Sequence, residues 1–167
     1  MIPDMSDTEK QFLQVNMDWL FNTDIEKLWQ AWTDPSILIK WFGSDPSGIV
    51  LSAVLEVIPG GQFEIEFMDS DHTFHTCFGV YTEVEMNFRL HFTWSWKSEP
   101  GHCSYVKVEM KKMHSGTHMQ FEHGGLNPGS AHNYETGWKN TFLKLESYLN
   151  KESITTSNDS KNLKPNF

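Results

Sequence analysis

Met86-Asn87-Phe88-Arg89-Leu90-His91-Phe92-Thr93-Trp94-Ser95-Trp96 is the stretch that decides the fold, because its even positions are all large and apolar and its odd positions are all polar. A period of two is typical of a β-strand with one dry face and one solvated face. The dry face is mostly aromatic, so a broad apolar surface must cover it. The stretch therefore predicts one strand of an antiparallel sheet that is covered on one side, with room for a pocket.

The segments around this strand complete an α+β pattern. We expect a first strand over residues 11–21, and then two short helices, the first capped by Thr23 with Glu26 in a capping box and the second capped by Asp34. Further strands are expected over residues 49–58, 62–67, 74–84, 86–96, 103–112 and 117–123. Short turns join these strands, so they should meander antiparallel.

A long last helix is the natural cover for the aromatic face of this sheet. Asn127 and Pro128 can cap and open it, and Tyr134, Trp138 and Leu145 recur at helical spacing. We expect this helix to end near residue 150, because residues 151–167 turn abruptly to Lys, Ser, Thr and Asn and predict a flexible polar tail. Residues 1–10 predict a loose lead-in, which leaves one domain over residues 11–150.

Composition and charge exclude several classes of partner. The net charge is −9 and no basic cluster occurs, which argues against nucleic acid and anionic membranes as partners. No basic-then-apolar signal segment and no apolar stretch near 18 residues appear, so we expect a cytoplasmic protein that is not inserted in a membrane. Cys77 and Cys103 fall in different predicted strands and are expected to be reduced thiols. Nothing in the sequence predicts an oligomeric state.

Several motifs resemble, in order and spacing, those of the heat-shock protein 90 ATPase activator homologues, a family of the START-like (SRPBCC) helix-grip superfamily. The matching segments are residues 15–21, 23–35, 41–43, 58–63, 79–84 and 90–94, with Gly137, Trp138, Leu145 and Leu149 on the last helix. The resemblance covers roughly residues 11–150. One departure is Ile58, which stands where the family has a basic residue before its Pro-Gly-Gly turn.

The resemblance implies a curved antiparallel sheet of about seven strands, with two short helices after the first strand and a long C-terminal helix across the sheet. It also implies three functions. The first is binding of a small apolar or aromatic ligand between sheet and helix, which requires a cavity of about 300–1,000 Å³. The second is a co-chaperone module that stimulates heat-shock protein 90. The third is a cyclase-like enzyme that uses the same cavity.

The candidate ligand-binding residues are mostly aromatic side chains on the inward face of the sheet and on the last helix. They are Trp41, Phe63, Trp94, Trp96, Phe121, His123, Tyr134 and Trp138. These residues can either fill the core or line a cavity. We expect Met86, Phe88 and Leu90 to belong to the core, and Trp94 and Trp96 to contact any ligand.

Catalytic and metal chemistry have little support in the sequence. His123 is either a hydrogen-bonded core residue, a polar anchor for a ligand or, least of all, a general base. The enzyme hypothesis would need it to meet a second titratable group such as Glu56 inside the protein. No metal-binding motif, nucleophile motif or phosphate-binding glycine loop occurs, so we predict no metal, no cofactor and no catalytic residue.

Overall fold

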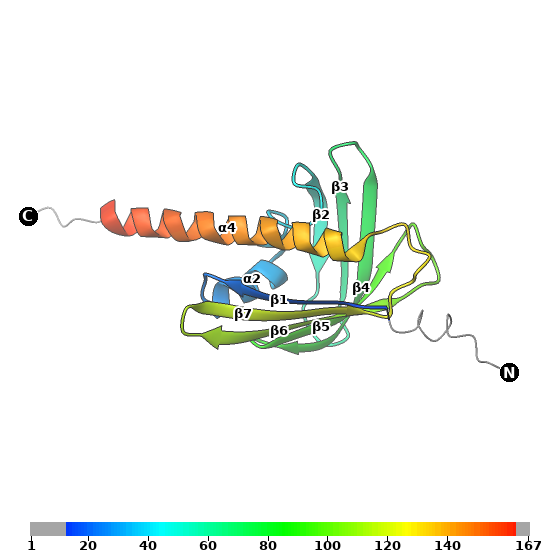
Figure 1. Cartoon of the computed structure of the whole chain (residues 1–167), viewed down its shortest axis with the longest axis horizontal. Helices are drawn as coiled ribbons and strands as arrows, with labels where there is room; N and C mark the ends of the chain where they lie inside the picture. The colour runs from blue at the N-terminus through cyan, green and yellow to red at the C-terminus, as the bar shows by residue number, and fades with distance from the viewer. Residues whose placement is uncertain (1–12, 163–167) are drawn as a thin grey trace, which may run out of the picture.

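A computed structural model describes residues 13–162 of the chain, with the backbone alone for residues 153–162. The lead-in predicted for residues 1–10 lies outside the described residues. The described part forms one antiparallel sheet, two short helices and one long helix (Figure 1). These elements confirm the α+β helix-grip fold that the sequence predicts.

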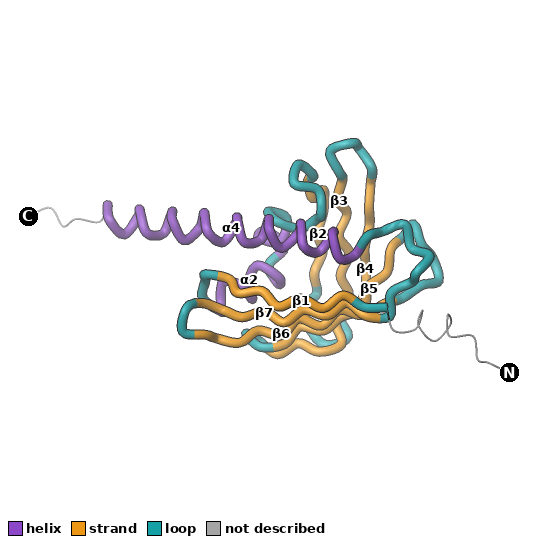
Figure 2. Tube along the Cα trace, viewed as in Figure 1, coloured by secondary structure: helices purple, strands orange, loops and turns teal. Residues whose placement is uncertain are grey.

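The sheet contains seven strands in the order β1-β7-β6-β5-β4-β3-β2. Their bounds are Val15–Phe21 for β1, Ile49–Leu55 for β2, Gln62–Met68 for β3, Phe74–Glu85 for β4, Arg89–Trp96 for β5, Ser104–Met113 for β6 and Gly116–Gly124 for β7. All neighbouring strands pair antiparallel, and the first strand lies beside the last. Figure 2 shows the short turns that join consecutive strands from β2 to β7.

Three helices occupy the concave side of the sheet. Their bounds are Ile25–Thr33 for α2, Pro35–Leu38 for α3 and Tyr134–Asn162 for α4. In Figure 1 the sheet bends so that β2, β3 and β4 run across the direction of β1, β6 and β7, and α4 passes through the angle between them. The bend encloses the aromatic face of β5 between the sheet and the helices.

The core gathers around the ring of Trp32 on α2. Its centroid lies 5.0 Å from that of Trp41, 6.1 Å from Phe142 and 6.5 Å from Phe121. These rings come from α3 and its exit, from α4 and from β7, so one side chain joins helices and sheet. Each buried ring of this size stabilises the fold by about 1.5–3 kcal/mol.

The start of β5 differs from the sequence prediction. The chain turns tightly before Arg89, with Asn87 at a φ of 61° and the Phe88 N–H donating to the Glu85 carbonyl at 3.0 Å. Met86 is therefore 74% exposed and Phe88 42% exposed, and their assignment to the core is wrong. Leu90, Phe92, Trp94 and Trp96 alternate into the interior as predicted.

The predicted start of α2 is also wrong. Asp24 occupies the N-cap of α2, and the side-chain oxygen of Thr23 is buried and has no hydrogen-bond partner within residues 13–152. The Thr23 carbonyl accepts from the Thr117 hydroxyl at 2.9 Å, which fixes Thr23 against β7 instead of the helix. Asp34 caps α3 as predicted, since its carboxylate accepts from the Ser36 N–H at 2.9 Å.

The long helix begins later and ends later than predicted. The Asn127 side chain accepts from the Gly129 N–H and shapes a turn, while Asn133 accepts from the Thr136 N–H and caps α4. The helix then continues to Asn162, into the segment that we assigned to the polar tail. Leu149 is the last core residue among the described side chains, so α4 extends beyond the packed part of the domain. No helix in the described residues is long and apolar enough to span a membrane.

Candidate functional site

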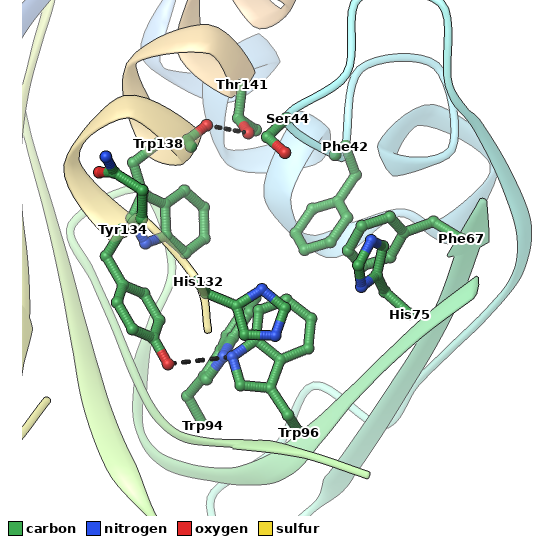
Figure 3. A pocket seen from close by; sticks show the side chains of 13 residues that line it. Phe42, Ser44, Phe67, His75, Trp94, Trp96, His132, Tyr134, Trp138 and Thr141 are labelled. Atoms are coloured by element: carbon green, nitrogen blue, oxygen red, sulfur yellow. Dashed lines mark hydrogen bonds between the residues drawn. The ribbon is translucent and has the colours of Figure 1, made fainter. Parts of the chain in front are cut away.

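A cavity of about 100 Å³ opens at the N-terminal end of α4. Its walls come from the loop after α3, from β3, β4 and β5, and from the first turns of α4 (Figure 3). The apolar lining consists of Phe42, Phe67, Trp94, Trp96 and Trp138. The polar lining includes Ser44, His75, His132, Tyr134 and Thr141. Aromatic faces with a few polar groups are the usual composition of a small-molecule site.

Four of the eight predicted ligand-binding residues line this cavity, namely Trp94, Trp96, Tyr134 and Trp138. The other four are buried in the core away from it. Trp41 and His123 are fully enclosed, and Phe63 and Phe121 are nearly so. The Trp41 indole donates to the Ala31 carbonyl at 3.0 Å, so its polar atom is already satisfied within the core.

The space between the middle of the sheet and α4 is packed instead of open. The hollow lined by Trp32, Phe63 and Phe92 measures only about 20 Å³, room for about one water molecule and too little for a ligand. The expectation of a cavity of about 300–1,000 Å³ is therefore wrong. The larger of the two spaces is the cavity of about 100 Å³ at the N-terminal end of α4.

His123 forms the centre of a buried hydrogen-bond chain. The Trp138 indole N–H donates to His123 Nδ1 at 2.9 Å, so Nδ1 carries no proton. The proton of the neutral ring then sits on Nε2, which lies 2.7 Å from the Ser104 hydroxyl. Ser104 in turn donates to the Trp94 carbonyl at 3.2 Å. Every polar atom of the ring is satisfied, so His123 belongs to the core.

Burial keeps this histidine neutral. Desolvation lowers the pKa of His123 to about 3, and the nearby His102 adds to the effect. A charged imidazole would also lose the acceptor that Trp138 needs. His123 is therefore a clamp between α4, β7, β6 and β5, and it fixes two walls of the cavity through Trp138 and Trp94.

A second polar contact shapes the mouth of the cavity. The Trp96 indole N–H donates to the Tyr134 hydroxyl at 3.0 Å, which ties β5 to the first turn of α4. The His132 ring stacks on Trp96 with centroids 3.9 Å apart and an interplanar angle of 11°. Burial raises the pKa of Tyr134. The phenol therefore stays protonated at neutral pH.

Sequence reasoning missed Phe42, Phe67, His75 and His132 as lining residues. Phe67 follows the inward phase of β3, so its periodicity could have placed it on this wall. Phe42 and His132 lie in loops, where no periodicity indicates the direction of a side chain. His75 reaches the cavity from the start of β4, and its ring lies 5.1 Å from that of Phe67.

The acid–base pair that the enzyme hypothesis would use does not form. Glu56 is exposed in the segment after β2, whereas His123 is enclosed and its ring nitrogens are both engaged. In the described part of the chain, no group of three or more His, Cys, Asp or Glu side chains could hold a metal ion. Cys77 is buried and Cys103 exposed, and they form no disulfide.

Comparisons with known proteins agree on the fold. A family model described as Activator of Hsp90 ATPase homolog 1-like protein matches residues 22–150. A search of curated proteins found no match.

Solved structures from several bacteria are similar over most of the chain. A protein from Nitrosomonas europaea is 23% identical, with 85% of this chain and 97% of that chain covered and a TM-score of 0.72. The AHSA1 protein from Silicibacter pomeroyi is 21% identical, with 84% and 99% covered and a TM-score of 0.73. A protein from Mesorhizobium loti is 25% identical, with 83% and 98% covered and a TM-score of 0.66.

We predict that the His123 clamp makes the fold sensitive to acid. The folded-state pKa of about 3 lies below the ordinary value of 6.5, so the stabilisation is present above pH 6.5 and is lost as the pH falls toward 3. Urea unfolding is measured at pH 7, 6 and 5 for the unmodified protein and for His123→Gln. The free energy of unfolding should fall more steeply with decreasing pH in the unmodified protein than in His123→Gln. The difference in slope should approach about 1.4 kcal/mol per pH unit. Equal slopes in the two proteins would contradict a buried neutral His123.

Proposed function

The chain belongs to the family of Activator of Hsp90 ATPase homolog 1-like proteins, and we propose that it is a binding domain for a small, mostly apolar ligand. The cavity at the N-terminal end of α4 is the observation that supports this function. Aromatic rings from β3, β4 and β5, from the loop after α3 and from α4 leave space between them there. A ring or branched head group would fill it.

The cavity offers both apolar contact and orientation. Trp94 and Trp138 lie 5.3 Å apart at 63° and pack edge to face against each other, so together they form one continuous aromatic wall beside the cavity. Ser44 and Tyr134 supply hydroxyl groups at the rim. The Tyr134 hydroxyl is held by Trp96 and lies 3.4 Å from the Ser130 hydroxyl, which preorganises it.

Gly137 provides a direct test, because its missing side chain leaves part of the cavity open. A β-carbon there would lie 3.7 Å from the Ser44 β-carbon, an ordinary contact that needs no rearrangement. Gly137→Ala should therefore stabilise α4 by about 0.5–1 kcal/mol through helix propensity. The same methyl group should compete with a ligand for space. If the added methyl group makes the free energy of ligand binding less favourable by about 1 kcal/mol, the affinity falls roughly fivefold.

The experiment titrates benzyl alcohol into the protein and follows quenching of tryptophan fluorescence, alongside native mass spectrometry of freshly purified protein for a retained small molecule. Gly129→Ala is the matched control, because it adds a methyl group on an exposed turn outside the cavity. We expect Gly137→Ala to weaken binding and Gly129→Ala to leave it unchanged. Unchanged binding in a well-folded Gly137→Ala protein would place the ligand elsewhere.

The second candidate function is stimulation of heat-shock protein 90. Two observations favour it, the description of the family and one feature of the protein surface. The outer face of the sheet carries a hollow of about 750 Å³ whose lining includes Val54, Phe78 and Val80. Phe74 is also exposed at the start of β4. Exposed apolar surface of this kind is typical of protein contacts.

The chaperone role predicts that this protein stimulates ATP turnover by a bacterial heat-shock protein 90. Phe78→Ser should remove most of the stimulation, because it makes the outer face polar without touching the cavity at α4. Gly137→Ala serves as the control that leaves the outer face intact. ATP turnover that does not change at an excess of the unmodified protein would contradict this role.

A further inference from the structure

Two carboxylate–histidine pairs flank the cavity. Asp69 Oδ2 lies 2.7 Å from His75 Nε2, and Glu99 Oε2 lies 3.6 Å from His132 Nε2. Both histidines line the cavity, and their ring centroids are 5.5 Å apart (Figure 3). The four residues come from the turn between β3 and β4, from β4, from the loop after β5 and from the loop before α4. The fold thus places the carboxylates of Asp69 and Glu99 on the same side of the cavity, each behind a histidine ring.

Hydrogen bonds satisfy these carboxylates only in part. Asp69 Oδ1 and Glu99 Oε1 are buried and have no hydrogen-bond partner among the described residues. The other Glu99 oxygen accepts from the Ser130 hydroxyl at 3.0 Å, a neutral donor. Burial lowers the pKa of His132, an effect that Glu99 opposes, so its imidazole is mainly neutral at pH 7.5. A neutral partner orients the carboxylate without cancelling its charge.

Lys144 carries an opposing charge that acts on Asp45 and Asp69. Its ammonium donates to the carbonyl oxygens of Gly43 and Asp45 at 3.2 and 3.0 Å. Asp45 adds a further carboxylate, whose pKa hydrogen bonds from Ser70 and Ser47 hold at about 2. Carboxylates therefore outnumber ammonium groups around the cavity, and the potential inside it favours a cation.

The aromatic rings that line the cavity also favour a cation. The faces of tryptophan and phenylalanine rings carry partial negative charge and attract cations within about 6 Å of the ring centroid. Trp94 and Trp96 lie 5.2 Å apart at 84°, and Phe42 lies 6.1 Å from Trp94, so rings of different orientation surround a small volume. This arrangement is typical of sites that hold an ammonium group.

We propose that the ligand is an organic cation, a small amine or ammonium compound whose charged group enters the cavity beside His75 and His132. This inference rests on the proposed binding function and names the chemical class that the same cavity selects. The aromatic rings contact the cation directly. Asp69 and Glu99 attract it from behind the two histidines, whose unbonded ring nitrogens accept hydrogen bonds from an amine.

The test compares three probes of nearly the same shape on the unmodified protein at pH 7.5 and low salt. Benzylamine is a cation, benzyl alcohol is neutral and benzoate is an anion. We expect benzylamine to bind about tenfold more tightly than benzyl alcohol, and benzoate to bind most weakly. The preference for benzylamine should shrink as salt is added, because the carboxylates are only partly buried.

The paired variants Asp69→Asn and Glu99→Gln remove the charges with little change of shape. Each should lower the preference for benzylamine over benzyl alcohol by about three- to tenfold. Glu64→Gln is the matched control for net charge, because Glu64 is exposed on the outer face and pairs with Lys97 at 2.9 Å. The control should keep the preference of the unmodified protein.

The outcomes separate this inference from the function on which it rests. Benzyl alcohol or benzoate binding as tightly as benzylamine overturns the cation proposal and leaves the binding function in place. A preference for benzylamine that both carboxylate variants retain also overturns it. If none of the three probes binds, the binding function itself fails. Should a variant not fold, the probe series on the unmodified protein still decides.

Discussion

The hydrogen-bond chain from Trp138 through His123 and Ser104 to Trp94 is the constraint on which the site depends. It joins α4 to three strands at the depth where the packed core ends and the cavity begins. Each donor in it has one acceptor, so breaking any link leaves a buried polar group unpaired, at a cost of about 1–3 kcal/mol. The same chain fixes the rings of Trp94 and Trp138, and with them two walls of the cavity.

This clamp explains why the interior is divided. On one side of His123, the rings of Trp32, Phe121 and Phe142 pack without space for a ligand. On the other side, Gly137 and the loop at Gly43 and Ser44 leave room because they bring little side-chain volume. Such a division allows a stable core and an open site in one small domain, since the core does not have to loosen when a ligand enters.

The fold could be predicted from the sequence because its signals are periodic. Leu90, Phe92, Trp94 and Trp96 alternate over a full strand, and Trp138, Phe142 and Leu145 lie on one face of α4. The errors fall where a tertiary contact or a turn overrides the local pattern. Asn87 turns the chain before Arg89 and exposes Met86, and the contact with Thr117 takes Thr23 away from the helix start. α4 also continues past residue 150, through a segment whose Ser, Thr and Asn residues do not favour a helix, so no local signal in the sequence predicts this extension.

The site could be predicted only in part. Trp94, Trp96, Tyr134 and Trp138 reach the cavity because they lie at the end of β5 and on the inward face of α4. Trp41, Phe63, Phe121 and His123 have the same sequence signature, an inward aromatic or polar side chain, yet they fill the core. Only the bend of the sheet decides which inward residues meet space and which meet other side chains. The charges of Asp69 and Glu99 lie behind histidines from other segments, so no local pattern predicts that they act together.

The position of the binding site is tested most directly by the indole ¹H–¹⁵N NMR signals of the tryptophans during a titration with benzylamine. Three of these side chains line the cavity and others lie in the core, so the signals report the position of the ligand. We predict that the signals of Trp94, Trp96 and Trp138 shift, while those of Trp32 and Trp41 stay in place. Shifts confined to Trp32 and Trp41, or saturable binding that moves none of the cavity tryptophans, would contradict a site at the N-terminal end of α4.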